Sequence, residues 1–397
     1  MKSTEFFFDT HTLTDEAIHR ITQAGLCSGY ALAAWKLPGS TIKSVLLADG
    51  ARTFSAGDQL ENLEGGFVFC PFNRQEPGYY LQADLLFKLK DEKISYEENP
   101  LAVTSAEWLK NQAEPAEPVS FYRPASEAPL FRQQQPDFKK LVAECVQYIA
   151  TGSVEKIVPS RYKAIPLPSE FNPIMAFQKL CAAHPHALVS LVSIPEVGTW
   201  LGASPEILVQ VEDHSIFRTV ALAGTQPYTP GANLKEVAWT QKEIEEQALV
   251  SRYIINCFKK IRLREFEEHG PKTVVAGNLL HLKTDFAVDL KATNFPQLAS
   301  VMLNLLHPTS AICGMPMEPA LQFLKNHEGY TRQFYAGFLG PVNIDNAIRV
   351  YVNLRCMQVT AQSLVCYAGC GVTIDSVPQK EWEETEMKLN SLLTVVL

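Results

Sequence analysis

Strand-like segments that follow one another without an intervening helix constrain the fold of this chain most strongly. Residues 186–226 contain the segments HALVSLVSI, GTWLGASPEILVQV and FRTVALAGTQ, and the C-terminal part contains AIRVYVNLRCMQV and SLVCYAGCGVTI. Antiparallel strands can be joined by a short turn, whereas parallel strands need a long crossover that is usually a helix. The sequence therefore predicts antiparallel sheets and disfavours a doubly wound parallel sheet.

Helical periodicity marks several segments around these strands. After Asp137, apolar residues recur at helical spacing until Gly152, which predicts a helix there. Further helices are predicted at about 172–183, 235–264, 295–306 and from Pro378 to Leu393. A proline-rich stretch at 121–136 predicts an extended crossing. We therefore expect residues 1–120 to form the N-terminal part and residues 137–397 the catalytic region of one structural domain.

Composition narrows the class of protein. The 397 residues carry a net charge of −8, which argues against nucleic-acid binding by phosphate neutralisation. No segment approaches the roughly 18 apolar residues of a membrane span, and the start MKSTEFFFDT does not resemble a signal peptide. The nine cysteines are scattered and form no CxxC, which suits a reducing compartment. We expect a cytoplasmic protein with neither nucleic-acid nor membrane partners.

Two helical segments carry pairs of glutamates at i, i+3 spacing. Glu381 and Glu384 share a stripe with Lys388 on the last predicted helix, and Glu243 and Glu246 repeat the spacing on the long one. Carboxylate oxygens are hard ligands suited to Mg²⁺, and two facing pairs could hold it directly or through water. Such pairs are also common on solvated helix faces, so the spacing alone leaves both interpretations open.

Lys156 and Glu206 are candidate acid–base groups. Lys156 lies between Val154 and Val158 on one face of a predicted strand, where desolvation could free its amine to act as a base. An edge-strand lysine that discourages aggregation is the alternative. Glu206 opens the apolar strand ILVQV, where a raised pKa would keep it protonated as a general acid. Its alternative is an ion pair at the start of a strand.

Arg355 and a glycine-rich segment are candidate anion-binding groups. Tyr351, Asn353 and Arg355 share one face of a predicted strand, and a fixed guanidinium there could hold a carboxylate through two parallel hydrogen bonds. Residues 369–371 could turn backbone N–H groups toward an anion, although a tight turn needs glycine equally. His281 in LLHL is by itself typical of a strand or core histidine.

Taken together, these segments resemble the chorismate-utilising enzymes, which include isochorismate, salicylate, anthranilate and aminodeoxychorismate synthases. The resemblance covers about Asp137 to the C-terminus, whereas the first third matches only weakly. The strings that carry it, in order, are KIVPSR, LGASPEIL, LAGTQ, KEIEEQALV, LLHL, HPTSAICGMP, TRQFYAGFLG, NLRC, YAGCGV and EWEETEMKL. The family fold that this implies is α+β, with large antiparallel β-sheets flanked by helices and the site between them.

The resemblance also implies roles for individual residues. Lys156 corresponds to the base that activates water, and Glu206 to the acid that protonates the departing hydroxyl. Mg²⁺ is the implied cofactor and chorismate the implied small-molecule substrate. The implied metal ligands are Glu243, Glu246, Glu381 and Glu384. The implied substrate-binding residues are Gly224, Thr225, His281, Ala311, Arg355, Gly369, Cys370, Gly371 and Lys388.

Two alanines favour the isochorismate synthases within this family. Ala223 stands where aminodeoxychorismate synthases carry a lysine nucleophile, and Ala311 where anthranilate and salicylate relatives usually have threonine. The implied reaction adds water at C2 of chorismate and removes the C4 hydroxyl, for menaquinone or for siderophore and salicylate synthesis. With water as the nucleophile, no glutaminase subunit is expected. Salicylate synthase and a non-catalytic chorismate-binding regulatory protein are the alternatives.

Four residues depart from the common family pattern. Pro159 stands where an aliphatic residue is usual, and it predicts a bend after Lys156. The other three are Gln226 and Glu383, each in place of a frequent arginine, and Gln247, in place of a frequent histidine. None removes a proposed catalytic group. They make the local charge more negative, so we expect them to affect metal affinity and the electrostatics of the pocket.

Overall fold

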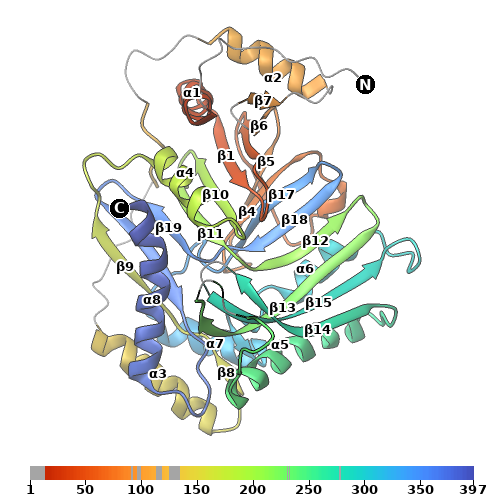
Figure 1. Cartoon of the computed structure of the whole chain (residues 1–397), viewed down its shortest axis with the longest axis vertical. Coiled ribbons are helices and arrows are strands. Elements are labelled where there is room, and N and C mark those ends of the chain that lie inside the picture. The colour runs from red at the N-terminus through yellow and green to blue at the C-terminus, as the bar shows by residue number, and fades with distance from the viewer. Residues whose placement is uncertain are drawn as a thin grey trace.

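Two large antiparallel sheets form the centre of the protein. The computed structural model describes residues 14–90, 93–95, 100–112, 119–124, 135–229, 231, 233–276 and 279–397. Most of the predicted proline-rich crossing, residues 125–134, lies outside the described residues. The two sheets have nine strands each, and helices pack against them (Figure 1). The predicted α+β fold with antiparallel sheets is confirmed.

The first sheet, which we call sheet A, joins N-terminal strands to strands from the rest of the chain. Strand β1 pairs with β2 on one side and with β10 on the other. In spatial order the strands are β7 (Lys93–Ser95), β6 (Leu85–Lys90), β2 (Lys43–Ala48), β1 (Ala31–Lys36), β10 (Leu188–Ile194), β11 (Gly198–Ser204), β19 (Cys356–Val359), β20 (Ser363–Gly369) and β9 (Ser160–Pro166).

The second sheet, sheet B, is built in the same interleaved way. Strand β4 from the N-terminal part pairs with the late strand β17. In spatial order the strands are β14 (Glu267–Ala276), β15 (Leu279–Asp289), β13 (Ile216–Pro227), β12 (Ile207–Glu212), β18 (Ala347–Val352), β17 (Phe338–Ile344), β4 (Gly66–Cys70), β5 (Gly78–Gln82) and β3 (Arg52–Phe54). A separate two-stranded sheet pairs β8 (Lys156–Ile157) with β16 (Gly314–Met315).

Alternation along the strands divides the core into two clusters. In β1, Ala31, Ala33 and Trp35 belong to one buried cluster, which also contains the core of sheet B, whereas Leu32 and Ala34 belong to the other. Successive side chains of a strand point to opposite faces, so sheet A is buried on both sides. Apolar contacts of this kind are the main favourable contribution to folding.

Helices cover the outer faces of the sheets (Figure 1). Helices α1, α4 and α8 contact strands of sheet A, α5 and α6 contact sheet B, and α3 packs on α8. The helices are α1 (Thr14–Cys27), α2 (Pro100–Lys110), α3 (Gln135–Ala150), α4 (Pro173–Ala183), α5 (Gln241–Lys260), α6 (Leu298–Leu306), α7 (Met317–His327) and α8 (Pro378–Val396). Among the described residues, no helix is both long and apolar enough to cross a membrane.

Three element boundaries differ from the sequence-based predictions. The long helix begins at Gln241 and not near 235, because Thr240 caps it in a reciprocal capping box with Glu243. The segment after Lys156 is not one continuous strand: it is interrupted at residues 158–159, where Pro159 predicted a bend. The strand predicted through Arg355 ends at Val352, and a new strand starts at Cys356 in the other sheet.

Candidate active site

Two neighbouring connections between the sheets bring Glu206 and Arg355 to the same place. The chain passes from sheet A to sheet B between β11 and β12, and it returns between β18 and β19. The backbone N–H of Val352 donates to the carbonyl oxygen of Glu206 at 2.9 Å, and that of Ala203 donates to the carbonyl of Arg355 at 3.0 Å. These hydrogen bonds fasten the two connections together, so both side chains face one region.

This region contains a cavity of about 280 Å³. Its lining combines both sheet connections with the start of α5, the end of β20 and the face of α8. Most residues predicted for the site line it, namely Glu206, Gly224, Thr225, Glu243, Glu246, His281, Ala311, Arg355, Gly369, Cys370, Gly371, Glu384 and Lys388. Lys156 and Glu381 do not line the cavity itself, and each is placed next to a residue that does.

Lys156 is buried directly behind the cavity wall. Its side chain is only 2% exposed, and its Nζ donates to Glu246 Oε1 at 2.7 Å. A Cβ atom on Gly371 would lie 2.9 Å from Lys156 Cε and 3.1 Å from Glu246 Oε1. Glycine at position 371 therefore leaves the space that this ion pair fills. The predicted burial of Lys156 is confirmed. Its ion pair with the Glu246 carboxylate was not predicted from the sequence.

Glu206 has the environment that a general acid requires. Burial raises the pKa of its carboxyl group to about 7, although the charges of Lys156 and Lys388 and a hydrogen bond with the Thr309 side chain oppose the shift. At neutral pH the carboxyl group is therefore partly protonated, and it lines the cavity. The raised pKa predicted from the apolar sequence around Glu206 is thus reproduced by its surroundings in the fold.

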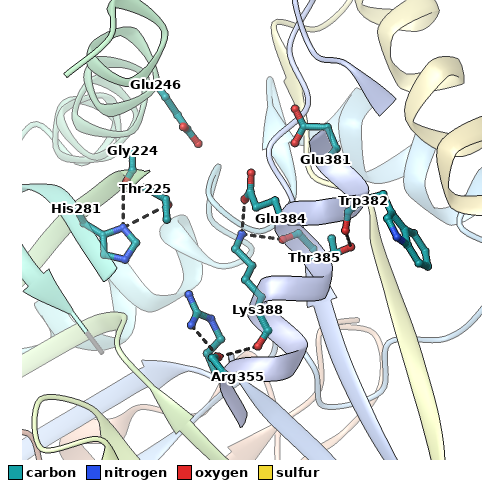
Figure 2. A network of polar contacts seen from close by, with 12 residues as sticks. Gly224, Thr225, Glu246, His281, Arg355, Glu381, Trp382, Glu384, Thr385 and Lys388 are labelled. Carbon is teal, nitrogen blue, oxygen red and sulfur yellow. Dashed lines mark hydrogen bonds and ion pairs between the residues drawn. The ribbon is translucent and has the colours of Figure 1, made fainter. Parts of the chain in front are cut away.

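Helix α8 presents its polar stripe to the site, as the i, i+3, i+7 spacing predicted (Figure 2). Lys388 Nζ donates to Glu384 Oε1 at 2.6 Å and to the carbonyl oxygen of Gly369 at 2.9 Å. Glu381 is buried, and burial together with the neighbouring Glu384 raises the pKa of its carboxyl group. Lys242 of α5 forms an ion pair with Glu381, and its Nζ lies 3.5 Å from Glu381 Oε1.

The glutamates of α5 have two different surroundings. Burial would raise the pKa of Glu246, but the charge and hydrogen bond of Lys156 outweigh it and lower that pKa. Glu243 belongs to the capping box of α5: its Oε2 accepts from the backbone N–H of Thr240 at 2.7 Å and from Gln226 Nε2 at 3.0 Å. One oxygen of Glu243 is therefore already used to hold the start of the helix.

These carboxylates fit a magnesium ion that keeps part of its water shell. Within the ranges that the structure describes, no three His, Cys, Asp or Glu residues are close enough to hold one metal ion. Mg²⁺ usually takes one or two protein carboxylates and completes its shell with water and substrate oxygens. The carboxylates of Glu246, Glu381 and Glu384 lie around the space between α5 and α8 (Figure 2). Lys242 already offsets part of the cost of burying the Glu381 carboxylate, and a magnesium ion would offset more of it.

His281 is a neutral imidazole in the cavity wall. Burial lowers its pKa to about 4, and its Nδ1 donates to the carbonyl oxygen of Gly224 at 2.8 Å. Gly224 adopts a positive φ of 71°, which aims this carbonyl at the ring. The Nε2 atom is buried and has no hydrogen-bond partner among the described residues. With the proton on Nδ1, the lone pair of Nε2 is unused and can accept a hydrogen bond.

The anion-binding part of the site differs in detail from the prediction. Arg355 is not on a strand: it has a φ of 47° in the connection between the sheets, and its Nη1 reaches Ser391 Oγ at 3.4 Å. Its guanidinium still lines the cavity. The N–H of Cys370 is not open to an anion, because it donates to the carbonyl of Pro159 at 3.2 Å. Residues 370–372 pair with β8 and with Pro159 just after it, and this pairing occupies the N–H of Cys370.

The other departures from the family pattern lie away from the cavity or support its frame. Gln247 is buried and donates to Thr284 Oγ1 at 2.9 Å, so it ties α5 to β15. Glu383 is exposed and accepts from Gln379 Nε2 at 2.6 Å on α8. Glu383 does not line the cavity.

Several residues of the site were not predicted from the sequence. Lys242, Tyr335 and Tyr367 line the cavity, and Tyr335 stacks on Tyr367 with ring centroids 5.4 Å apart. Lys242 directly precedes Glu243, so the charge of the KEIEEQ string was the available signal. Tyr335 lies in TRQFYAGFLG and Tyr367 in YAGCGV, so these two strings of the family resemblance were the available signal.

The sequence matches a known family over most of its length. The model of a family described as chorismate binding enzyme matches residues 61–397. Isochorismate synthase EntC of Escherichia coli strain K12 is 27% identical over 355 residues, covering 81% of this chain and 88% of the relative.

Solved structures extend the likeness to the whole fold. The menaquinone-specific isochorismate synthase MenF from Escherichia coli has a TM-score of 0.77 at 20% identity, covering 100% of this chain and 94% of that one. Anthranilate synthase component I from Streptococcus pneumoniae has a TM-score of 0.66 at 19% identity, covering 91% and 89%. The family match, which spans most of the length, shows that the chain belongs to the chorismate-binding enzymes.

Proposed function

We propose that this protein is an isochorismate synthase, an isomerase that converts chorismate to isochorismate with Mg²⁺. The observation that carries the proposal is that Glu206, with a pKa of about 7, lines the cavity, while Lys156 lies directly behind its wall and contacts Glu246, which lines it. The likeness to isochorismate synthase EntC supports the same reaction. Alanines at positions 223 and 311 line the cavity and offer no side-chain nucleophile or hydroxyl there.

Lys156 is assigned as the base that takes a proton from the attacking water. Its Nζ lies beside Gly371 and Glu246, and both of these residues line the cavity. In the ion pair with Glu246 the Lys156 side chain is an ammonium, so it first passes a proton to that carboxylate, and the neutral amine then takes one from the water that attacks C2. Water is a poor nucleophile, and general-base catalysis typically contributes about 10²–10⁴-fold.

Glu206 is assigned as the acid that protonates the C4 hydroxyl as it leaves. Hydroxide is a poor leaving group, so proton transfer to this oxygen lowers the barrier to breaking the C–O bond. In its protonated form the carboxyl group holds the proton needed, and burial favours that form. The product retains the atoms of chorismate with one water added and one lost, and no pyruvate is released.

The remaining groups bind and orient the substrate. Arg355 and Lys388 supply positive charge for its carboxylates, with Arg355 able to form two parallel hydrogen bonds. His281 offers Nε2 as an acceptor for a substrate hydroxyl, and Gly224 and Thr225 complete that wall beside it. We propose that these contacts orient the ring with C2 toward Lys156 and C4 toward Glu206.

Magnesium is proposed to bind between α5 and α8, held by Glu246, Glu381 and Glu384, with Glu243 behind them. When bound, the ion neutralises a substrate carboxylate and polarises the conjugated ring system. The protein holds the helices that carry these ligands through the capping box of α5 and the packing of α3 on α8. We further propose a cytoplasmic location, since all nine cysteines are free thiols.

The product profile tests this proposal. Purified protein is incubated with chorismate, with Mg²⁺ or with EDTA, and ammonium is added in one arm. We expect isochorismate that approaches a plateau without pyruvate, and no turnover in EDTA. Salicylate with pyruvate would identify a salicylate synthase, and an aminated product in the ammonium arm would identify a different member of the family. Binding without turnover would indicate a regulatory protein. One relative is described as menaquinone-specific and another as vibriobactin-specific, and both are isochorismate synthases. Isochorismate is therefore the product that we propose.

A further inference from the structure

A buried ion pair lies behind the cavity wall. Glu328 is 6% exposed and Arg332 is 3% exposed. Arg332 Nε donates to Glu328 Oε2 at 2.7 Å, and its Nη2 donates to Oε1 at 2.7 Å. The guanidinium and the carboxylate therefore pair through two hydrogen bonds, which fixes their relative orientation.

The remaining hydrogen bonds of this pair go to two separate chain segments. Arg332 Nη1 donates to the carbonyl of Ile312 at 2.8 Å, and Nη2 donates to that of Val158 at 2.7 Å. Glu328 Oε1 accepts from the backbone N–H of Ser160 at 2.6 Å and from its hydroxyl at 2.7 Å. One side chain pair thus grips the segment 158–160 and the loop around residue 312.

Both gripped segments carry residues of the site. Val158 lines the cavity and lies two residues after Lys156, while Ile312 lines it next to Ala311. The sheet that joins them, β8 with β16, has only two residues per strand. A ladder of two residue pairs supplies little rigidity, because it contains few backbone hydrogen bonds between the strands. The turn that carries Arg332 also ends in the cavity, since Tyr335 N–H donates to the carbonyl of Arg332 at 3.0 Å.

A buried ion pair is weak evidence for stability, because desolvation offsets most of the attraction between the charges. Its better-supported contribution is a unique arrangement of the groups around it. Here the arrangement concerns three walls of one cavity: the segment after Lys156, the loop that carries Ala311, and the turn before Tyr335. Neither Arg332 nor Glu328 lines the cavity, so the pair acts only through the residues that it holds.

We propose that Glu328 and Arg332 are positioning residues that fix the strand bearing Lys156 against the loop bearing Ala311. The inference rests on the proposed function for its catalytic consequence. Its structural part concerns only the two gripped segments. The planar fork of arginine matches these acceptors, whereas the single ammonium of a lysine cannot reach all of them at once.

The test compares Arg332→Lys with Ser160→Ala and with Val45→Ala. Ser160→Ala removes the hydroxyl that contacts Glu328 and Tyr330 and leaves the ion pair in place, so it remains informative if Arg332→Lys fails to fold. Val45 is buried in β2 of sheet A and serves as the control for general destabilisation. Backbone hydrogen exchange is measured for peptides covering residues 156–160 and 311–315, and kcat and KM are measured with chorismate.

We expect Arg332→Lys to raise exchange in both peptides and to lower kcat at least tenfold, with KM changed less than threefold. Ser160→Ala should shift both readouts in the same direction by less, and Val45→Ala should leave both near wild type. Unchanged exchange in the two peptides, or raised exchange with wild-type kcat, would overturn the inference. If the wild-type protein does not convert chorismate, the proposed function fails, and hydrogen exchange alone decides whether the pair holds the two segments.

Discussion

Lys156 Nζ lies 2.7 Å from Glu246 Oε1, so the proposed base is the direct partner of a proposed metal ligand. The two residues are 90 positions apart and come from β8 and α5. Lys156 is almost fully buried, whereas the Glu246 side chain is 25% exposed. The carboxylate is therefore the member of the pair that can turn toward the cavity, and its position links the base to the metal ligands.

Removal of the Lys156 amine should abolish most of the turnover. We expect Lys156→Ala to lower kcat by about 10²–10⁴-fold, the usual contribution of a general base. Steady-state kinetics with chorismate measure this, and thermal unfolding checks that the variant is folded. Lys163→Ala is the matched control, because Lys163 lies on β9 outside the cavity lining, in a half-buried ion pair with Glu386. Turnover of Lys156→Ala within threefold of wild type would show that the base is another group.

The raised pKa of Glu206 predicts the alkaline side of the pH profile. The acid acts in its protonated form, which predominates below its pKa of about 7 and is lost as the pH rises through that value. We therefore expect kcat/KM to fall above pH 7. Glu206→Gln cannot donate the proton, so its residual activity should lack this decline. The same decline in the Gln variant would assign it to a different residue.

Gly371 should be required for activity and nearly dispensable for stability. A Cβ atom there meets the flexible ends of Lys156 and Glu246, which can shift at little cost but lose their relative position. We expect Gly371→Ala to lower kcat at least tenfold, while the free energy of unfolding changes by less than about 1 kcal/mol. Gly57→Ala is the control, since a Cβ atom at Gly57 meets nothing within 4 Å. Wild-type turnover in Gly371→Ala would show that the relative position of Lys156 and Glu246 does not matter for catalysis.

Neighbouring glutamates of α8 should differ in their effect on magnesium binding. Glu381 is buried at the proposed metal site, whereas Glu383 is exposed and contacts Gln379. We expect Glu381→Gln to weaken Mg²⁺ binding at least about tenfold, as measured by calorimetry, and Glu383→Gln to leave it unchanged. Equal effects of the two substitutions would indicate a general loss of negative charge and not a lost ligand.

Local spacing predicted the parts of the site that one element carries. The i, i+3, i+7 pattern placed Glu381, Glu384 and Lys388 on one stripe, and the Lys388–Glu384 contact at 2.6 Å agrees with it. The apolar neighbours of Glu206 predicted its raised pKa in the same way. The helical stripe depends only on residues close in sequence, whereas the pKa of Glu206 also depends on the burial that the fold supplies and on Lys156, Lys388 and Thr309.

Contacts between distant segments could not be predicted in this way. Arg355 continues an alternating pattern, but that pattern is the same whether a strand continues or crosses to another sheet, as it does here. The glycine at 371 suggested an anion-binding turn, whereas its main requirement is the space taken by Lys156. Lys242 beside Glu381 likewise depends on how α5 and α8 pack.

Incorporation of solvent oxygen tests directly whether the protein adds water at C2 of chorismate. Chorismate is converted in H₂¹⁸O with Mg²⁺, and isochorismate is analysed by mass spectrometry and NMR at an early time, with pyruvate assayed in parallel. We expect one ¹⁸O atom at C2, no pyruvate, and loss of this labelled product in the Lys156→Ala variant. Unlabelled isochorismate, or salicylate accompanied by pyruvate, would contradict the addition of water activated at this site.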